Sequence, residues 1–219
     1  MTTYAAIVLA GGAARRMGGR DKPALPVGGV PMRERVLAAV ADATPRILVG
    51  PGPAPAGVLP ARESPPGGGP VAATAAGLAL LEPGVPVVAL LAADLPLLTR
   101  PAVGDLLRQL DTPPNTPPNT PPGTPPNAPP CTPLEMPPQV DGVCFVDASG
   151  RRQTLCGVWR TDALRAALDR LAGRHSGAPL RELLAGLTVR EVTWSGGGPP
   201  PWFDCDTDGD VRRAEEWAR

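Results

Sequence analysis

The sequence predicts an α/β fold in which a doubly wound, mostly parallel sheet is flanked by helices on both faces. Short apolar runs alternate with segments whose apolar residues repeat at helical spacing, the pattern of strand–helix–strand units. The 219 residues suit one domain with a substantial core. Two glycines directly follow the first apolar run, where open α/β sheets bind ligands. We therefore expect a single domain over 1–219, with a proline-rich surface insertion at 112–138.

In the first half of the chain, predicted strands and helices alternate. Strands are expected at 4–12, 46–50 and 85–96, and helices at 30–43, 70–81 and 100–110. The proline- and glycine-rich residues between the second strand and the second helix predict a turn. The strand at 85–96 is the most apolar, and it is expected to deliver Asp94 into the crevice at the sheet edge just before Pro96.

In the second half, a proline tract comes first. Residues 112–138 form a near-tetrapeptide repeat that predicts an extended or disordered insert, which we prefer to a docking motif for a proline-binding partner. The further elements expected are a hairpin at 142–159, a helix at 161–173 capped by Thr161 or Asp162, a short helix at 179–187, a strand at 188–194 and a terminal helix capped by Asp208.

Composition excludes several classes of function. With 21 basic and 21 acidic residues the formal net charge is zero, so we expect no nucleic-acid partner and no membrane partner. The N-terminal MTTYAAIVLAGG has no basic region before its short apolar stretch, which argues against a signal peptide and for a cytoplasmic protein. Four scattered cysteines without a C-x-x-C pair argue against zinc and disulfides. His175 lies in a polar loop, which disfavours histidine chemistry.

The first glycine-rich turn is a candidate phosphate site. Gly11 and Gly12 let backbone N–H groups approach an anion, and three basic side chains follow, those of Arg15, Arg16 and Lys22. Lys22 is the only lysine in the chain. The spacing fits neither the Walker A motif nor the dinucleotide fingerprint, so an ordinary strand-to-loop turn stays an alternative at this point.

The acidic residues suggest a magnesium site. Mg²⁺ is commonly held by one or two carboxylates, with phosphates and water completing its shell, and Asp94 suits that role. Near the C-terminus, four aspartates alternate with other residues: Asp204, Asp206, Asp208 and Asp210. Either Asp204 or Asp206 is a candidate second ligand, and we favour Asp206. The spacing does not match an EF-hand loop.

The stretch LAGGAARRMGGRDKPAL, residues 9–25, strongly resembles the signature of nucleotidyltransferases with a GT-A-like, Rossmann-type fold. It is most similar to that of the molybdenum cofactor guanylyltransferases, the MobA-like nucleotidyltransferases. The matching residues are Arg15, Arg16, Met17, Gly18, Asp21 and Lys22. Further segments resemble the family's in the same order: GGPVAATAAGL, LLAADLPLLT, QTLCGVWR and WFDCDTDGDV. The resemblance covers nearly the whole chain except the proline tract.

The resemblance implies transfer of GMP from GTP to the phosphate of molybdenum-bearing molybdopterin, with release of pyrophosphate. It implies Mg²⁺ as cofactor, GTP and molybdopterin as small-molecule substrates, and transient contact with other molybdenum cofactor proteins. The catalytic residues implied are Lys22, Asp94 and Arg15; the nucleotide-binding residues are Leu9, Ala10, Gly11, Gly12, Lys22, Glu63 and Asp94; the metal ligands are Asp94 and Asp206.

The chain also departs from the family pattern. Gly50 replaces an asparagine, and Arg62 or Glu63 takes the place of an aspartate, so the contact to the base is altered. Two alternatives stay open: a related transferase that uses CTP or acts on another phosphorylated acceptor, and a non-catalytic nucleotide-binding scaffold. Gln153 with Arg151 or Arg152, on the later hairpin, is a candidate contact to the pterin.

Overall fold

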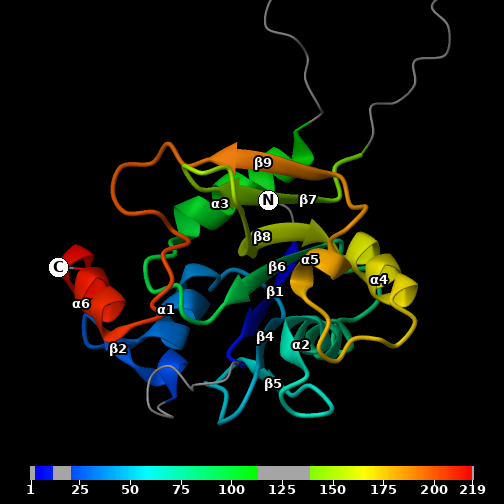
Figure 1. Ribbon diagram of the computed structural model, residues 1–219, viewed down its shortest axis with the longest axis horizontal. Coiled ribbons are helices and arrows are strands. Elements are labelled where there is room, and N and C mark those ends of the chain that lie inside the picture. The colour runs from blue at the N-terminus through cyan, green and yellow to red at the C-terminus, as the bar shows by residue number, and fades with distance from the viewer. Residues whose placement is uncertain (1–2, 12–20, 113–138, 219) are drawn as a thin grey trace, which may run out of the picture.

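A computed structural model describes residues 3–11, 21–112 and 139–218. Its main sheet has seven strands in the order β5-β4-β1-β6-β8-β7-β9 (Figure 1). Their bounds are β1 Tyr4–Leu9, β4 Arg46–Val49, β5 Leu59–Ala61, β6 Val87–Ala92, β7 Gly142–Val146, β8 Arg152–Arg160 and β9 Val189–Thr193. Only β8 runs against the other strands of this sheet. The predicted mostly parallel α/β sheet is confirmed.

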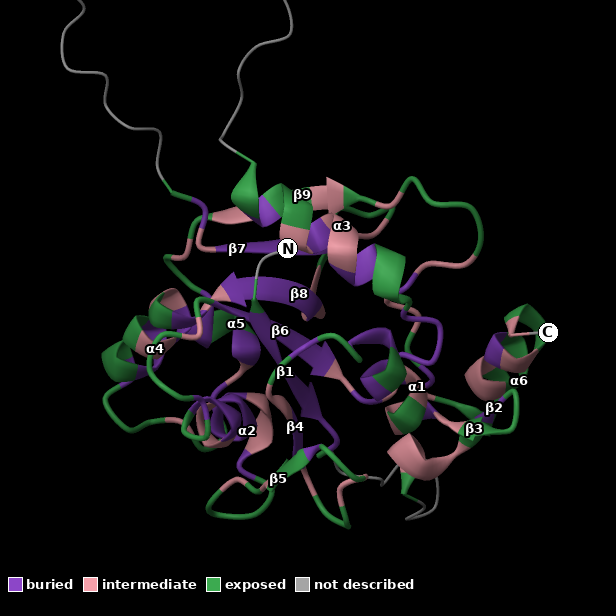
Figure 2. Cartoon of the chain, turned by 180° about the vertical axis from the view of Figure 1, so that it is seen from behind, coloured by how far each residue is buried: buried purple, intermediate pink, exposed green. Residues whose placement is uncertain are grey.

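The central strands β1 and β6 are apolar throughout, because both of their faces are covered. All six residues of β1 are buried, and Figure 2 shows β1 and β6 in the buried class. They pair in parallel with Ile7 opposite Leu90. This register brings the carboxyl ends of β1 and β6 to the same edge of the sheet, with Leu9 beside Ala92.

Helices cover the sheet on both faces. Alternate residues of β1 divide between the two cores. Tyr4, Ala6 and Val8 pack with helices α1 (Met32–Ala39) and α3 (Arg100–Asp111). The opposite face carries α2 (Gly69–Leu78), α4 (Thr161–Arg170) and the short α5 (Leu180–Leu183), as Figure 1 shows. At Gly77 of α2 a Cβ atom would lie 2.7 Å from the Ile7 side chain, so glycine permits the close approach of α2 to β1.

The C-terminal helix α6 (Asp208–Trp217) lies apart from the main sheet, beside the small hairpin of β2 (Pro26–Val27) and β3 (Val30–Pro31) (Figure 1). A small separate core joins them: Val27, Met32, Leu97, Cys205 and Ala214. The predicted cap of this helix was wrong. Thr207 is the N-cap and forms a capping box with Asp210, whereas Asp208 is the first residue of the helix.

Other boundaries also differ from the sequence-based expectations. Strand β6 ends at Ala92, so Asp94 lies in the turn that follows and not on the strand. Helix α4 starts at Thr161 with no side-chain cap, and the Thr161 side chain is buried. The supposed turn after residue 50 contains β5, a three-residue strand that pairs with β4 although it includes a proline, which is tolerated at a sheet edge. The hairpin of β2 and β3 was also not predicted.

Arg160 joins the two segments that flank the proline tract. Its Nε donates to the Val140 carbonyl at 2.9 Å, and its Nη2 donates to the Leu110 carbonyl at 3.5 Å. Helix α3 ends at Asp111, with Thr112 as its C-cap. The rest of the predicted 112–138 tract, residues 113–138, lies outside the described residues. Among the helices of the described part of the chain, none has the length and apolar character needed to cross a membrane.

Candidate active site

The carboxyl edge of the sheet gathers the residues predicted to bind nucleotide. Leu9 and Ala10 are buried, and Gly11 is exposed where the chain leaves the sheet. The Ala10 N–H still donates to the Val49 carbonyl at 2.7 Å, and the Leu9 carbonyl accepts from Ala93 N–H at 3.0 Å. These bonds extend the ladder past the end of β1. The backbone of this turn is therefore held on both sides by its neighbouring segments.

The position directly after β4 is occupied by Gly50, and close packing against the first turn requires a glycine there. It has a φ of 152°, and a Cβ atom there would lie 2.8 Å from the carbonyl carbon of Ala10. Any larger residue would push against the backbone of the first turn. Glycine at position 50 therefore allows the two turns to pack closely, and it leaves no side chain there to contact a base.

Glu63 follows β5 and faces the first turn. Its Oε1 accepts the Gly67 N–H at 3.1 Å and lies 3.5 Å from the position that a Cβ of Gly11 would take. Its Oε2 is buried and has no hydrogen-bond partner among the described residues. A buried carboxylate oxygen without a partner is costly, and such an atom at a candidate site indicates a missing donor. Arg62, the alternative considered above, is exposed.

Lys22 bridges two of the predicted acids. Its Nζ lies 2.5 Å from Asp94 Oδ2 and 2.7 Å from Asp206 Oδ1. The three residues come from the start of the 3-10 helix η2 (Lys22–Ala24), the turn after β6 and the segment before α6. The Lys22 and Asp94 side chains are largely buried, with 18% and 22% of their area exposed, and that of Asp206 is 49% exposed. Burial lowers the pKa of Lys22, but the hydrogen-bonded carboxylates of Asp206 and Asp94 outweigh it and raise that pKa overall. The ammonium therefore stays charged.

Asp204 belongs to the same electrostatic environment. Burial raises the pKa of Asp204, and the negative charges of Asp206 and Asp94 raise it further. The backbone joins the two acid-bearing segments, because the Cys205 N–H donates to the Asp94 carbonyl at 3.2 Å. Of the two candidate second ligands, it is Asp206 whose carboxylate shares the ammonium with Asp94.

The carboxylate pair suits a hard divalent cation. Mg²⁺ prefers oxygen ligands and commonly takes one or two carboxylates together with phosphate oxygens and water. Asp94 and Asp206 supply that donor set. Within residues 3–11, 21–112 and 139–218, no three acidic, cysteine or histidine side chains are placed to hold a metal by themselves. The fit is thus to a metal that shares its shell with a phosphorylated ligand.

Several predicted residues lie elsewhere. Gly12, Arg15 and Arg16 fall outside the described residues. The His175 Nε2 is 3.2 Å from the Leu168 carbonyl, in a loop after α4. Three cysteines are buried free thiols: Cys144, Cys156 and Cys205.

At the tip of the predicted hairpin, the candidate pterin contacts engage with their own neighbours. Gln153 Nε2 donates to Asp147 Oδ2 at 3.0 Å, and Arg152 pairs with Glu191 at 2.7 Å. Because β7 runs parallel to β9 and antiparallel to β8, this tip lies at the same sheet edge as Asp94. The hairpin therefore borders the site from the side of β9.

An aromatic cluster at this edge was not found from the sequence. Phe145 packs against Trp194 in an edge-on arrangement at 5.7 Å and against Trp202 at 5.2 Å. The three residues come from β7, the end of β9 and the segment before α6. No spacing rule joins positions so far apart, so only the topology of the sheet reveals the cluster.

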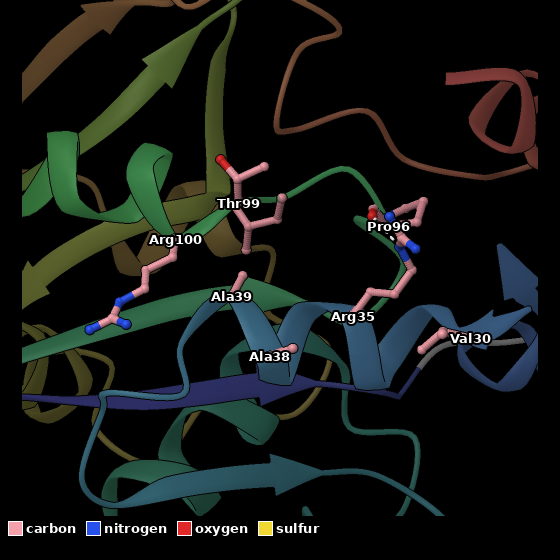
Figure 3. Close-up of a pocket in the computed structure, with 8 residues that line it drawn as sticks. Val30, Arg35, Ala38, Ala39, Pro96, Thr99 and Arg100 are labelled. Atoms are coloured by element: carbon pink, nitrogen blue, oxygen red, sulfur yellow. Dashed lines mark hydrogen bonds between the residues drawn. The ribbon is translucent and has the colours of Figure 1, made fainter. Parts of the chain in front are cut away.

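A separate pocket of about 340 Å³ lies between α1 and the segment that leads into α3 (Figure 3). Its lining residues are Val30, Arg35, Ala38, Ala39, Pro96, Leu98, Thr99 and Arg100. Arg35 donates to the Pro96 carbonyl at 2.8 Å, so its guanidinium braces the wall. No residue predicted to act on nucleotide or metal lines this pocket, and the acids and the glycine turn described above remain the candidate site.

Comparison with solved structures gives the fold class. Molybdopterin-guanine dinucleotide biosynthesis protein A from Archaeoglobus fulgidus is similar, with a TM-score of 0.63 and 16% identity over 97% of each chain. The 2-C-methyl-D-erythritol 4-phosphate cytidylyltransferase from Thermus thermophilus has a TM-score of 0.65 and 18% identity, covering 99% of this chain and 98% of its own. Rv0371c from Mycobacterium tuberculosis has a TM-score of 0.64 and 20% identity, covering 98% and 99%. The fold is that of the α/β nucleotidyltransferases.

A family model identifies the chain more closely. The model described as MobA-like NTP transferase domain matches residues 6–192, which extend from within β1 to within β9. The chain belongs to the MobA-like NTP transferase family. No curated protein matches the sequence significantly. The resemblance inferred from LAGGAARRMGGRDKPAL is confirmed at the level of this family, and the chain is a nucleotidyltransferase by family.

Proposed function

We propose that this protein transfers GMP from GTP to the terminal phosphate of molybdenum-bearing molybdopterin and releases pyrophosphate. The observation that carries the proposal is the meeting of Lys22, Asp94 and Asp206 at the sheet edge, beside a glycine turn. A phosphate acceptor is already anionic near neutral pH, so the reaction requires alignment and charge neutralisation and no histidine base. The composition, with one histidine, agrees with this chemistry.

The base is proposed to bind between the first turn and Glu63. A carboxylate is an acceptor only, and guanine offers N1–H and N2–H donors on one edge. The corresponding edge of cytosine has one amino donor and two acceptor atoms. A carboxylate would repel those two acceptors. Glu63 Oε2 has no hydrogen-bond partner within the described part of the chain and so favours guanine, and Oε1 is held in place by the Gly67 N–H. Leu9, Ala10 and Gly11 would contact the nucleotide chiefly through backbone groups, and Gly12 is proposed as a further nucleotide-binding residue.

In the transfer step, an oxygen of the acceptor phosphate attacks the α-phosphorus of GTP, and the bond from that phosphorus to pyrophosphate breaks. Lys22 would offset the charge that develops on the α- and β-phosphates, and Arg15 is proposed as a further phosphate contact. Asp94 and Asp206 would hold Mg²⁺, which when bound neutralises phosphate charge and fixes phosphate orientation. On the acceptor side, we propose that the hairpin carrying Arg151, Arg152 and Gln153 borders the pterin.

A second candidate is a transferase that uses CTP or another phosphorylated acceptor. The specific observation in its favour is the fold similarity to the Thermus cytidylyltransferase, which is as strong as that to the Archaeoglobus protein. A non-catalytic scaffold is the third alternative. The meeting of Lys22 with two acids argues against the scaffold, because a protein that only binds nucleotide does not require metal ligands.

The wider setting is also a proposal. We infer a cytoplasmic enzyme in which 1–219 form one domain, with 112–138 as an insertion. We infer that it meets other molybdenum cofactor proteins transiently, because its substrate and product are cofactors that must be handed on.

The test measures pyrophosphate release with Mg²⁺, molybdopterin and either GTP or CTP. Release with GTP that depends on the acceptor supports the proposal. Faster release with CTP would favour the second candidate, and binding without release would favour the scaffold. The matched control is Asp94→Asn, which keeps the size of the side chain and removes its charge, and it should abolish release while leaving the thermal midpoint within a few degrees.

A further inference from the structure

We propose that the Lys22 ammonium and the divalent cation compete for the same two carboxylates, so that the cation binds tightly only when nucleotide phosphates draw Lys22 away. This inference rests on the proposed function in one respect, because it takes Asp94 and Asp206 as the ligands of the metal. It adds a role for Lys22: the lysine couples metal binding to nucleotide binding.

The contact geometry carries the first step. The ammonium lies 2.5 Å from one carboxylate and 2.7 Å from the other, so it occupies the space between the two oxygen atoms. A magnesium ion that bound both carboxylates would need those oxygens at about 2.0–2.1 Å. Two cations cannot occupy this position together. Either the ammonium leaves, or the metal binds only carboxylate oxygens that do not contact Lys22.

The second step concerns which partner is able to move. The segment of Asp94 is joined to that of Asp206 by the Cys205 N–H, and the capping box of Thr207 and Asp210 fixes the chain just beyond Asp206. Both acids are thus held by backbone interactions that do not involve Lys22. The lysine has a flexible four-carbon stem, and at its base Asp21 pairs with Arg33 of α1 at 3.2 Å. The backbone fixes the positions of the two acids, whereas the Lys22 ammonium can move by rotation about the bonds of its side chain.

The third step is electrostatic. Asp94 and Asp206 bring two carboxylate oxygens to within 2.7 Å of the same ammonium, so their negative charges lie close together. Without a cation, the pair would repel each other strongly in a partly buried place. Lys22 supplies the compensating charge. When a nucleotide brings both phosphates and a metal, the ammonium has a new anionic partner and the carboxylates have a new cation, so each ligand strengthens the binding of the other.

The first experiment measures Mn²⁺ binding to the full chain without nucleotide, using electron paramagnetic resonance of the free ion. Lys22→Met removes the charge and keeps most of the side-chain volume, and we expect it to bind Mn²⁺ about tenfold more tightly than the wild type. Arg108→Met is the matched control, because it removes one positive charge from an exposed side chain on α3. Lys22→Met with an affinity equal to that of Arg108→Met would overturn the proposal. Adding Asp206→Asn to Lys22→Met should cancel the gain, and a retained gain would also overturn it.

A second measurement uses the wild-type chain and so does not depend on how the variant folds. Because Lys22 is the only lysine, labelling with lysine carrying ¹³C and ¹⁵N at the side-chain end gives one lysine signal. We expect this signal to shift as Mg²⁺ is added, with the same apparent affinity for Mg²⁺ as its displacement of bound Mn²⁺ gives. Metal binding that leaves the lysine signal unchanged would contradict the proposal. Neither measurement uses GTP or an acceptor, so a failure of the proposed transfer reaction is distinguishable from a failure of this competition.

Discussion

Lys22 Nζ lies 2.5 Å from Asp94 Oδ2, although the two residues are 72 positions apart in the chain. The parallel pairing of β1 and β6 sets Leu9 beside Ala92, so the segments that follow the two strands begin at the same end of the sheet. A cation and a carboxylate are thus held together at the edge where α/β sheets bind ligands. Asp206 completes the group from the segment before α6.

Lys22→Arg tests whether the site needs a compact ammonium. Arginine keeps the charge, but its broad planar group cannot take the place of a point-like ammonium between two phosphates. We expect the transfer rate to fall about 100-fold. Single-turnover kinetics with GTP would measure this loss, with the thermal midpoint as the check on folding. A rate near that of the wild type would refute the need for lysine.

Glu63→Gln tests the recognition of the base. The amide oxygen of glutamine can still accept the Gly67 N–H, while the amide nitrogen turns the partnerless acceptor into a donor. We expect affinity for GTP to fall about tenfold to 100-fold, since one hydrogen bond to a buried charged group is lost, and preference for CTP to rise. Competition binding with the two nucleotides measures the ratio. An unchanged ratio would remove Glu63 from the base site.

Asp42 provides a pH-dependent contribution to stability away from the candidate site. Burial raises the pKa of Asp42, but the hydrogen bond from Tyr4 at 2.7 Å and the pairing with Arg100 at 3.1 Å outweigh it, and the pKa is lowered overall. A lowered folded-state pKa gives stability that is present above the unfolded value and is lost as the pH falls through the folded value. We expect Asp42→Asn to lower the thermal midpoint at neutral pH by about 2–4 °C.

The difference between Asp42→Asn and the wild type should vanish in acid, well below the usual carboxyl pKa of about 3.9. Thermal unfolding at a series of pH values measures this. Asp105→Asn is the control, because Asp105 forms an exposed pair with Arg108 within α3, and such surface pairs contribute little. A difference that is the same at every pH would mean that Asp42 acts through its shape and not its charge.

Deleting residues 113–130 tests the view of the proline tract as an insertion. Arg160 holds the carbonyl groups of Leu110 and Val140, so the two flanking segments are positioned independently of the tract. Shortening a connection of this length changes the closure entropy by little. We expect activity and the thermal midpoint to be nearly unchanged. Loss of both activity and solubility on this deletion would show that the tract has a structural role.

Periodicity predicted most of the fold because the central buried strands are uninterrupted apolar runs. YAAIVL and VVALLA leave no ambiguity, whereas β5 has only three residues, one of them a proline, amid a proline- and glycine-rich stretch. Its pairing with β4 comes from tertiary context, which overrides weak local preference. Four alternating acids near the C-terminus predict Asp208 as a helix cap, but Thr207 is the N-cap, because Asp210 is correctly spaced to complete the capping box.

The site was predictable in its members and not in its geometry. The glycine turn, Lys22, Asp94 and the C-terminal acids stood out from their residue types and motif order. The hydrogen bond from Lys22 to Asp206 joins residues 184 positions apart, and no sequence pattern predicts a contact over that separation. The Glu63 oxygen that lacks a partner among residues 3–11, 21–112 and 139–218 is likewise a property of packing, because it depends on how β5 and the first turn meet.

The central claim is that the site moves a nucleotidyl group and not a terminal phosphoryl group. The most direct test incubates the protein with Mg²⁺, molybdopterin and GTP labelled with ³²P at either the α- or the γ-position. The account predicts that label from the α-position appears in the pterin product and that label from the γ-position appears in pyrophosphate. Label from the γ-position in the pterin product, or no transfer from either, would contradict it.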